Sequence, residues 1–397
     1  MYQEYEELLG LPELQVNQVF VTPRQIEVHC ESRLAEAHCP CCLQKCNFVK
    51  QTHQRKVKDL SISGKEVWLH LTCRQYVCKD CNRHFYEQFS FLEAKETVTR
   101  RYGERLYDLC GGIELQYVVV RENLCWQTVN RIFQKYGQKQ IHQHSVFATV
   151  TRLGIDEIAL KKGHKDYIAV IVDLDTGQVL DLLKERSKQA LINYFKAKGS
   201  GFCQQIKLFC SDMWEGYLSM AKEVFVNAVI VADRFHFFSR LQKAVDTCRR
   251  SLRNKHKQAD ELKNIKWLLL KNPSSLSGQE KQQLNALFAK PDYHLLQATY
   301  EAKNTFRDIL ASDLSRQEAE NQIQAWLTKM EESTNRFMND FVKFYTTWKS
   351  YILNYFQGRY TTGIIEGINN KIKSIKRRAF GFSNFDNFKL RVQTAFF

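Results

Sequence analysis

Proline and long apolar stretches are scarce in this sequence of 397 residues. Only five prolines occur, and no low-complexity linker separates one segment from the next. No apolar run reaches the ~18 residues that a membrane-spanning helix requires, so we expect no membrane contact. The first residues also lack the pattern of a secretory signal, and we therefore expect a cytoplasmic protein.

Positive charge is abundant instead. The chain has 58 Lys and Arg against 43 Asp and Glu, a formal net charge of +15. Such a surplus favours a polyanionic partner, because basic side chains displace counterions from phosphates. With 44% hydrophobic and 25% charged residues the chain is globular, and its length predicts two to four domains.

Cysteine is also abundant, with 13 residues, eight of them between Cys30 and Cys81. An odd, clustered set in a reducing compartment indicates a metal site rather than disulfides. Two CxxC knuckles predict one structural Zn²⁺ in a zinc ribbon, because four thiolates complete its tetrahedral shell and leave no open position. The predicted ligands are Cys39, Cys42, Cys78 and Cys81. Cys41, Cys46 or Cys73 could substitute, and His53 is a weaker alternative.

A short helical pattern follows the cysteines. We expect one helix at Val118–Leu124, a turn at Cys125 and a second helix at Trp126–Phe133. This spacing is typical of a helix-turn-helix, whose second helix enters the DNA major groove. The inward face would hold Val129, Ile132 and Phe133, and the DNA-facing residues would be Gln127, Asn130 and Arg131. The alternative is an ordinary helical hairpin.

Strand patterns dominate the next segment. We expect strands at Leu153–Leu160, Tyr167–Leu174, Gln178–Leu183, Ile206–Cys210 and Ala228–Val231, with helices before and after the fourth. This order is that of a ribonuclease-H-like core. The predicted fold class is multidomain α+β, with an α/β core interrupted by an all-helical insertion. The predicted segments are a lead-in (1–29), zinc ribbon (30–92), helix-turn-helix (93–145), first part of the core (150–240), helical insertion (241–345) and second part of the core with a basic C-terminal helix (346–397).

Two aspartates are expected to lie close together in this predicted core. Asp156 lies in the first strand and Asp212 follows the fourth, and these two strands are neighbours in such a sheet. Converging carboxylates repel each other unless a cation lies between them. Oxygen ligands suit Mg²⁺, and two such ions (or Mn²⁺) can clamp the attacking and leaving oxygens of a phosphodiester.

A third carboxylate is expected from a helix after the fifth strand. Glu366 is the best candidate, because a lone Glu in a basic helix is better explained as a metal ligand beside a phosphate path than as a solvated face. The basic residues that would line the DNA path are Lys371, Lys373, Lys376, Arg377 and Arg378. Asp233 is either a helix N-cap or, with His236, a support of the metal site. Taken singly, an aspartate at a strand end is more often a turn former or cap.

These motifs resemble those of bacterial insertion-sequence transposases of the ISL-three type. The knuckles resemble the family's zinc ribbon, Asp233-Arg234-Phe235-His236 is similar to its Asp-x-x-His box, and the segment from Glu366 to Phe382 is specific to it. The resemblance implies a DDE triad, which falls on Asp156, Asp212 and Glu366, with a helical insertion between the last two. In the first knuckle Leu43 replaces a usual glycine, which leaves the ligand register open.

We therefore expect a DNA transposase that binds terminal inverted repeats and catalyses Mg²⁺-dependent strand cleavage and transfer to target DNA. It would work as a homodimer or larger assembly on double-stranded DNA, associated with the nucleoid of a bacterial cytoplasm. Two alternatives remain: a non-catalytic DNA-binding regulator derived from a transposase, and a ribonuclease-H-like nuclease that cuts DNA without joining it.

Overall fold

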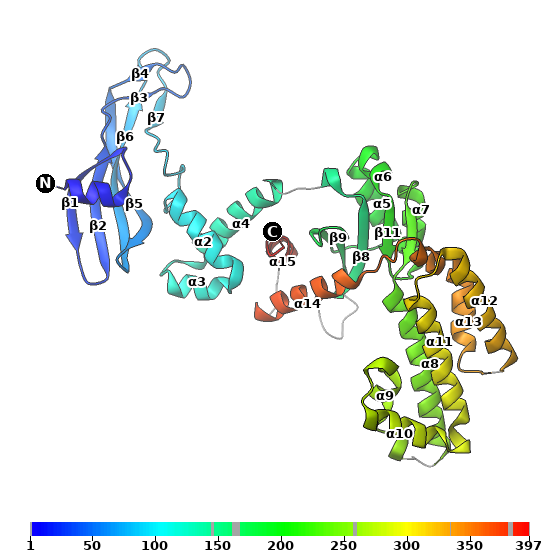
Figure 1. Ribbon diagram of the computed structural model, residues 1–397. Coiled ribbons are helices and arrows are strands. Elements are labelled where there is room, and N and C mark those ends of the chain that lie inside the picture. Colours follow the sequence, from blue (N-terminus) through cyan, green and yellow to red (C-terminus); the bar gives the residue numbers. More distant parts are fainter. Residues whose placement is uncertain are drawn as a thin grey trace. The chain divides into compact units, whose positions relative to one another are not determined.

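The chain divides into two compact units, Met1–His142 and Gln143–Phe397. A computed structural model, drawn in Figure 1, describes residues 2–143, 147–160, 167–256, 260–333, 335–379 and 384–396. Phe380 and Phe382, which belong to the C-terminal motif, lie outside the described residues. Within the described residues, no helix is both long and apolar enough to cross a membrane.

A twisted sheet forms most of the first unit. Its strands run in the order β1-β2-β6-β5, with β7 paired to β6. One face of β2 and β6 is buried, because alternate residues such as Val28, Leu69 and Leu71 pack into a common core. The strands are β1 (Leu14–Val21), β2 (Gln25–Ser32), β5 (Val49–Ile62), β6 (Lys65–Val77) and β7 (His84–Tyr86), after a short helix α1 (Gln3–Leu9). The sheet thus begins before residue 30, and the expected boundary there falls inside β2.

The cysteine knuckles lie at one end of this sheet. The short strands β3 (Ala37–His38) and β4 (Lys45–Cys46) pair with each other around the first knuckle. A separate small cluster of buried side chains, including Tyr76 and Phe85, surrounds the cysteines. The end that carries the knuckles therefore has a core distinct from that of the main sheet.

Three helices complete the first unit: α2 (Arg100–Gly112), α3 (Leu115–Arg121) and α4 (Trp126–Gln143). Gly103 allows α2 and α4 to approach closely, because a Cβ atom there would lie 2.9 Å from the Tyr136 hydroxyl. A buried polar link joins the helices to the sheet. Lys58 of β5 donates to the carbonyl of Glu122, which follows α3, and Asp59 accepts from Thr99, the residue that caps α2.

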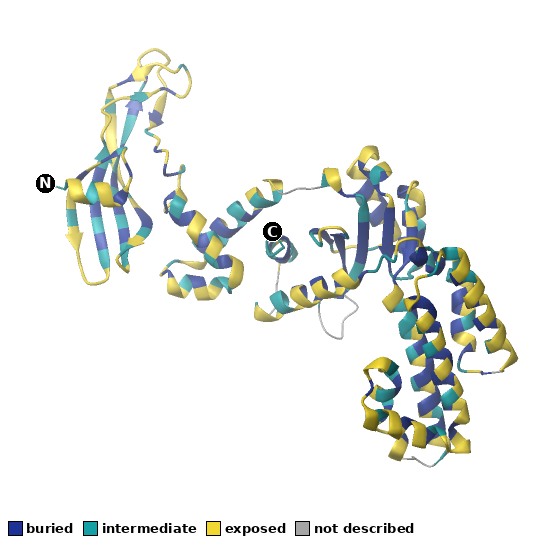
Figure 2. Cartoon of the chain, in the orientation of Figure 1, coloured by how far each residue is buried: buried dark blue, intermediate teal, exposed yellow. Residues whose placement is uncertain are grey.

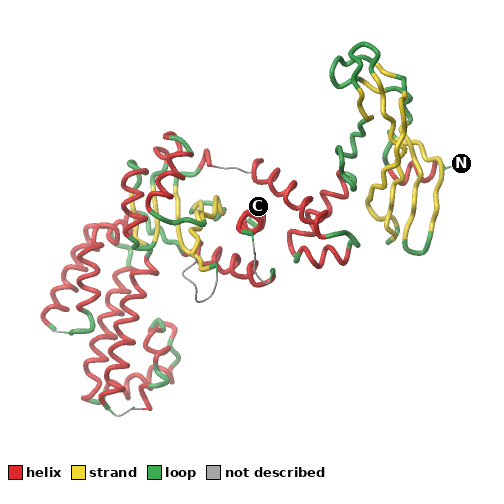
Figure 3. The backbone as a smooth tube through the Cα atoms, turned by 180° about the vertical axis from the view of Figure 1, so that it is seen from behind, coloured by secondary structure: helices red, strands yellow, loops and turns green. Residues whose placement is uncertain are grey.

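The second unit is built on a five-stranded mixed sheet in the order β10-β9-β8-β11-β12. β8, β11 and β12 are parallel, whereas β9 and β10 run antiparallel to their neighbours. The strands are β8 (Arg152–Ala159), β9 (Tyr167–Asp173), β10 (Val179–Leu183), β11 (Leu208–Ser211) and β12 (Val229–Ala232). Figure 3 shows the strands in yellow among the helices of this unit.

Helices cover both faces of this sheet, which explains the continuous apolar runs in its strands. One face packs against α5 (Lys188–Ala197), α6 (Ser200–Gln205) and α7 (Glu215–Val224). The other packs against α14 (Gly363–Arg378) and α15 (Phe385–Thr394). In β8, odd-numbered residues such as Ile155 face the first group, and even-numbered residues such as Ile158 face the second.

A long helical segment separates β12 from α14. Among its described residues, helices and single 3-10 turns occur but no strand. The α-helices are α8 (Arg234–Lys255), α9 (Lys266–Leu270), α10 (Gly278–Phe288), α11 (His294–Ala311), α12 (Arg316–Glu332) and α13 (Asn339–Leu353). Figure 2 shows α8 and α11 burying their facing sides against each other. Ser277 and Ser315 begin α10 and α12 with capping boxes, which fix where these helices start.

Candidate catalytic and DNA-binding sites

Two of the predicted acids come from adjacent strands. Asp156 lies in β8, and Asp212 follows the last residue of β11. The two strands are parallel neighbours, and Ser211 pairs with Ile155, so each acid follows a residue of the same pair. The prediction that these two strands are neighbours is thus confirmed, and the register puts Asp156, within β8, at the level of Asp212, directly after β11.

Burial makes ionisation of both acids unfavourable. It raises the pKa of Asp156, although the backbone N–H of Glu157 and the charge of His236 act in the opposite direction. The pKa of Asp212 is raised to about 6, first by burial and then by repulsion from Glu157. Acids of this kind are stabilised by a cation, because a bound positive charge removes both penalties.

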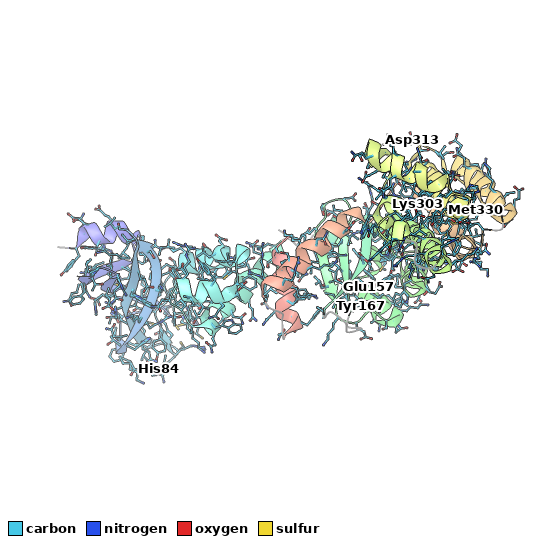
Figure 4. The ribbon with its side chains drawn as sticks, turned by 90° about the horizontal axis from the view of Figure 1, so that it is seen from below. His84, Glu157, Tyr167, Lys303, Asp313 and Met330 are labelled. Atoms are coloured by element: carbon cyan, nitrogen blue, oxygen red, sulfur yellow. The ribbon has the colours of Figure 1, made fainter. Side chains whose placement is uncertain are left out.

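Glu157 lies on the opposite face of β8 from Asp156. Its carboxylate accepts a hydrogen bond from the Tyr217 hydroxyl at 3.2 Å and forms an ion pair with Arg186. The Arg186 guanidinium lies 5.0 Å from the Tyr167 ring centroid and 5.6 Å from that of Trp214. Figure 4 labels Glu157 and Tyr167 on the sheet. Arg186 already compensates the charge of Glu157, which distinguishes it from Asp156 and Asp212.

Asp233 links the starts of two helices. It occupies the N-cap position of α8, but its side chain makes no capping hydrogen bond. Instead Oδ1 accepts from the backbone N–H of Thr362, immediately before α14, at 3.2 Å. His236 lies beside it, with Nε2 3.8 Å from Asp233 Oδ2 and 3.9 Å from Asp156 Oδ1. Asp233 therefore holds the start of α14 next to the acids, and His236 bridges two of them.

The close approach of α14 to β8 depends on a glycine. A Cβ atom on Gly154 would lie 2.6 Å from Cδ1 of Ile365 and 2.6 Å from Cδ2 of Leu174, so a larger residue would force these side chains to shift. In this position Asn369 donates from Nδ2 to Asp156 Oδ2 at 2.7 Å. Glu366 lies one turn earlier on α14 and is exposed. The structure thus connects Asp156 to Asn369, which the sequence reasoning missed. The only signal was its spacing of three residues from Glu366, which puts both on one side of a helix.

The three predicted acids do not form a closed cluster in the described part of the chain. The groups there whose ligand atoms all lie within 4.8 Å of one another are the four knuckle cysteines and Glu27 with His29 and His70. The site nevertheless has the chemistry for Mg²⁺. Its donors are oxygens, and two buried oxygens, Asp233 Oδ2 and Asn369 Oδ1, have no hydrogen-bond partner among the described residues.

Two of the five basic residues expected on the DNA path donate to backbone carbonyls elsewhere in the second unit. Lys371 donates to the carbonyl of Ala395, and Lys376 donates to that of Ala159 at 2.9 Å. Lys373, Arg377 and Arg378 are exposed. Lys371 and Lys376 therefore attach α14 to α15 and to the end of β8, and the remaining three present charge to solvent.

The predicted zinc ligands converge. Sγ of Cys39 lies 3.5 Å from that of Cys81, and Sγ of Cys42 lies 3.4 Å from that of Cys78. Tetrahedral ligands at the ~2.3 Å of a zinc–sulfur bond would be ~3.8 Å apart, so only a small expansion is needed. Backbone N–H groups, first that of Cys81, lower the pKa of Cys78 to about 6, which favours the thiolate.

The alternative ligands are placed less well. Cys41 is exposed, and Cys73 packs into the core of the main sheet. Cys46 is buried beside the cluster, but its sulfur is not among the four that all lie within 4.8 Å of one another. The geometry therefore favours the register Cys39, Cys42, Cys78 and Cys81.

The helix pair α3–α4 carries the residues expected to face DNA. The first helix ends at Arg121, earlier than expected, and α4 begins at Trp126 as predicted. Gln127 is exposed and Asn130 half-buried. Arg131 is exposed too, but it forms an ion pair with Glu96. Val129, Ile132 and Phe133 form the buried side of the helix, as predicted.

Comparisons with known proteins identify the family of the chain. A family model of the ISL-three (ISL3) type, described as "Transposase", matches residues 153–392. A second, described as "zinc-finger of transposase IS204/IS1001/IS1096/IS1165", matches residues 35–81. The chain is 29% identical over 370 residues to "Transposase for insertion sequence element IS1001" of Bordetella parapertussis, covering 90% of this chain and 88% of that protein.

A second relative is "Transposase for insertion sequence element IS1557" of Mycobacterium tuberculosis, 25% identical over 284 residues, or 65% of this chain and 63% of that protein. These matches put the chain in the class of insertion-sequence transposases. Since the first family model covers more than half of the sequence, the chain belongs to the ISL-three family of transposases.

Proposed function

We propose that the chain is a DDE transposase that binds the terminal inverted repeats of an insertion sequence, cleaves DNA at their ends and joins those ends to target DNA. The observation that carries this proposal is the pair of buried acids, Asp156 and Asp212, on neighbouring parallel strands with raised pKa values. In a basic chain of this family, such acids fit the binding of cations that act on a phosphodiester. The strand order β10-β9-β8-β11-β12 supports a ribonuclease-H-like core as part of this proposal.

Each residue of the site would have its own task. Asp156 and Asp212 would hold Mg²⁺, and Glu366 would complete the site from α14. Bound Mg²⁺ supplies Lewis-acid stabilisation of the attacking and leaving oxygens. Asp233 would support this arrangement, because it fixes the backbone just before α14. Asn369 would orient the Asp156 carboxylate by its hydrogen bond to Oδ2.

The first unit would recognise the DNA ends. A zinc ion on the four knuckle cysteines would stabilise its tip, and α4 would enter the major groove as the second helix of a helix-turn-helix. Gln127 and Asn130 offer side chains that can read base edges. Because each element has two ends, we propose that two or more copies of the chain assemble on DNA.

The experiment compares Asp156→Asn, Asp212→Asn and Glu366→Gln with the wild-type chain. The assay is Mg²⁺-dependent nicking and joining of labelled terminal-repeat DNA. These substitutions keep size and shape, so folding and end binding should persist while cleavage falls by ~10²-fold or more. Double variants should lose little beyond the single ones, because the acids act as one unit.

Asp313→Asn is the matched control, because Asp313 is a fully exposed acid in the helical segment. It should cleave like the wild type. Cleavage at the wild-type rate by Glu366→Gln would remove Glu366 from the triad and leave Glu157 as the next acid to examine. A wild-type chain that binds ends but never cuts them would instead support a non-catalytic regulator, and cutting without joined products would support a nuclease.

A further inference from the structure

The turn that begins α8 holds one aromatic ring outside the protein. Its polar residues each contact another part of the chain: Asp233 is buried and accepts from Thr362, the exposed Arg234 donates from its guanidinium to the Tyr355 hydroxyl at 3.0 Å, and the half-buried His236 lies beside two acids. Phe235, between them, is 61% exposed. It has no packing role comparable to that of Phe237, two residues later, which is fully buried.

The position of Phe235 relative to the acids is well defined. Its ring lies edge-to-face with His236, with the centroids 5.9 Å apart, and His236 in turn lies 3.9 Å from the carboxylate of Asp156. The ring stands on the first turn of a helix of 22 residues and not on a loop. A second apolar side chain, Ile364, is also exposed in the first turn of α14, whose start Asp233 holds beside α8. An exposed aromatic ring therefore lies next to His236, which contacts the carboxylates of Asp156 and Asp233.

Two of the acids are recessed, whereas Glu366 is exposed. The side chain of Asp156 is only 17% exposed and that of Asp233 only 2%. A phosphodiester in a fully stacked duplex is held along the outer surface of the helix, so it approaches a recessed carboxylate more easily once the adjacent nucleotide leaves the stack. An exposed aromatic ring can then receive the displaced base, because every base has an apolar face that stacks on such a ring.

We propose that the Phe235 ring stacks on a DNA base that is displaced from its pair beside the phosphodiester to be cut. This inference rests on the proposed function, since it assigns a substrate contact in the same site. It explains why an apolar side chain is exposed next to acidic residues. The basic residues of α14 need not contact the same nucleotide. Phe235 would hold the opened DNA end and would take no part in the chemistry.

The test measures Mg²⁺-dependent cleavage of labelled terminal-repeat DNA by the full chain with Phe235→Ala, Phe235→Tyr and Phe235→Trp. Two substrates are compared: a fully paired end, and an end with a mismatch at the base pair next to the cut. Phe235→Ala should cleave the paired end ~10-fold or more slowly, as expected for the loss of one base–aromatic stack. It should cleave the mismatched end within ~3-fold of the wild type, because the cost of unpairing is already removed. The two aromatic variants should keep activity on both.

A control and a spectroscopic readout complete the design. Trp267→Ala removes another exposed aromatic side chain, 72% exposed in α9 and away from the acids in sequence and fold, and should cleave both ends normally. With 2-aminopurine next to the cut, the fluorescence change on binding should be present in the wild type and lost in Phe235→Ala.

Two results would overturn the stacking role: equal cleavage of paired ends by Phe235→Ala and the wild type, or a defect in Phe235→Ala that is as large on mismatched as on paired ends. If the wild type itself cuts neither substrate, the proposed transposase activity fails, and the role of Phe235 fails with it. If the wild type cuts both and only the mismatch rescue is absent, the activity stands and the stacking role does not.

Discussion

Asp212 is the residue at which stability and function oppose each other most clearly. Its pKa is about 6 because burial and the charge of Glu157 both disfavour the carboxylate. At neutral pH the folded chain therefore carries a charge that it would hold at lower cost when unfolded. Acids of this kind persist in proteins where a ligand uses the charge, so the unfavourable ionisation of Asp212 is itself an argument for a bound cation.

This imbalance predicts how stability depends on pH. The pKa of Asp212 is about 6 in the folded chain, above the ~3.9 of an unfolded aspartate. Protonated Asp212 therefore contributes to the free energy of unfolding below pH ~4, and this contribution is lost as the pH rises through 6. Asp212→Asn cannot ionise, so at pH 7.5 without metal it should be more stable than the wild type by about 1–2 kcal/mol, after allowance for solvent screening. At pH 4 the difference should vanish.

The measurement is urea unfolding of both chains in EDTA at several pH values, followed by a repeat with Mg²⁺. Added Mg²⁺ should stabilise the wild type more than Asp212→Asn, because binding to the folded state shifts the unfolding equilibrium. Asp313→Asn, which alters an exposed acid, should show neither effect. An Asp212→Asn difference that is the same at pH 4 and pH 7.5 would show that ionisation of Asp212 is not its cause.

Single residues also show where reasoning from the sequence ends. The positions of Asp156 within one strand and of Asp212 directly after another follow from local apolar patterns, so both could be predicted. The hydrogen bond from Asn369 to Asp156 joins residues 213 positions apart and has no local signal. The same holds for the ion pair of Arg131 with Glu96, which engages a side chain expected to face DNA. Contacts of this kind depend on how the elements pack against one another. The periodicity of apolar residues along the sequence does not indicate that packing.

At the scale of elements, the contact between β8 and α14 governs the candidate catalytic site. β8 carries Asp156, and α14 carries Glu366 and Asn369. Gly154 and Ile365 set how close these elements come, and Asp233 fixes where α14 starts. The site thus combines residues from the beginning and from the end of the second unit's sequence. The whole helical segment lies between them along the chain. Its precision depends on backbone packing as much as on the acids.

The knuckle end of the first sheet gives the prediction that belongs to this scale. Purified chain should contain about one zinc per molecule, and Cys78→Ser should lose it, since three thiolates leave the tetrahedral shell incomplete. The loss should unfold the end around β3, β4 and β7, whose small core includes the cysteines. The main sheet should persist, because Val28 and Leu69 belong to a separate core. Metal analysis and hydrogen exchange would measure both effects.

Cys41→Ser is the matched control, because Cys41 lies in the same knuckle but is exposed. It should retain zinc. If Cys41→Ser loses the ion and Cys42→Ser keeps it, the ligand register is shifted by one residue. Zinc-free chain with a fully protected knuckle end would rule out a structural metal there.

Element types were easier to predict than element bounds. All five strands of the second sheet fall on segments that the apolar runs indicated, because buried strands need such runs. The first sheet was harder, since β1 and β2 carry the expected alternation but no feature that ties them to the cysteine segment. Their pairing with β6 lies beyond local sequence, so residues 1–29 could not be recognised as part of the same sheet.

At the scale of the whole molecule, the residues proposed for DNA recognition and those proposed for catalysis lie in different units. The knuckle cysteines and the exposed residues of α4 belong to Met1–His142, and all the candidate catalytic acids belong to Gln143–Phe397. Each unit has cores of its own. This division follows from packing: a sheet with three attached helices buries its apolar face without help from the second sheet. Each unit should therefore fold when expressed alone.

The last prediction follows from that division. Residues 1–142 alone should bind labelled terminal-repeat DNA in preference to unrelated DNA without cutting it, because base-reading side chains lie in this unit and acids of the site do not. Binding should weaken ~10³-fold or more between 50 and 200 mM salt if six or more phosphates are contacted, since each neutralised phosphate releases counterions. Gln127→Ala should reduce the preference for the repeats more than the affinity for unrelated DNA, because base contacts specify sequence and phosphate contacts do not.

Residues 143–397 alone should nick DNA in the presence of Mg²⁺ but show no preference for the repeats. Gel-shift titrations over a range of salt, with nicking assays on the same DNA, measure both. Repeat-specific binding by residues 143–397, with none by residues 1–142, would move recognition to the second unit and refute the assignment to α4.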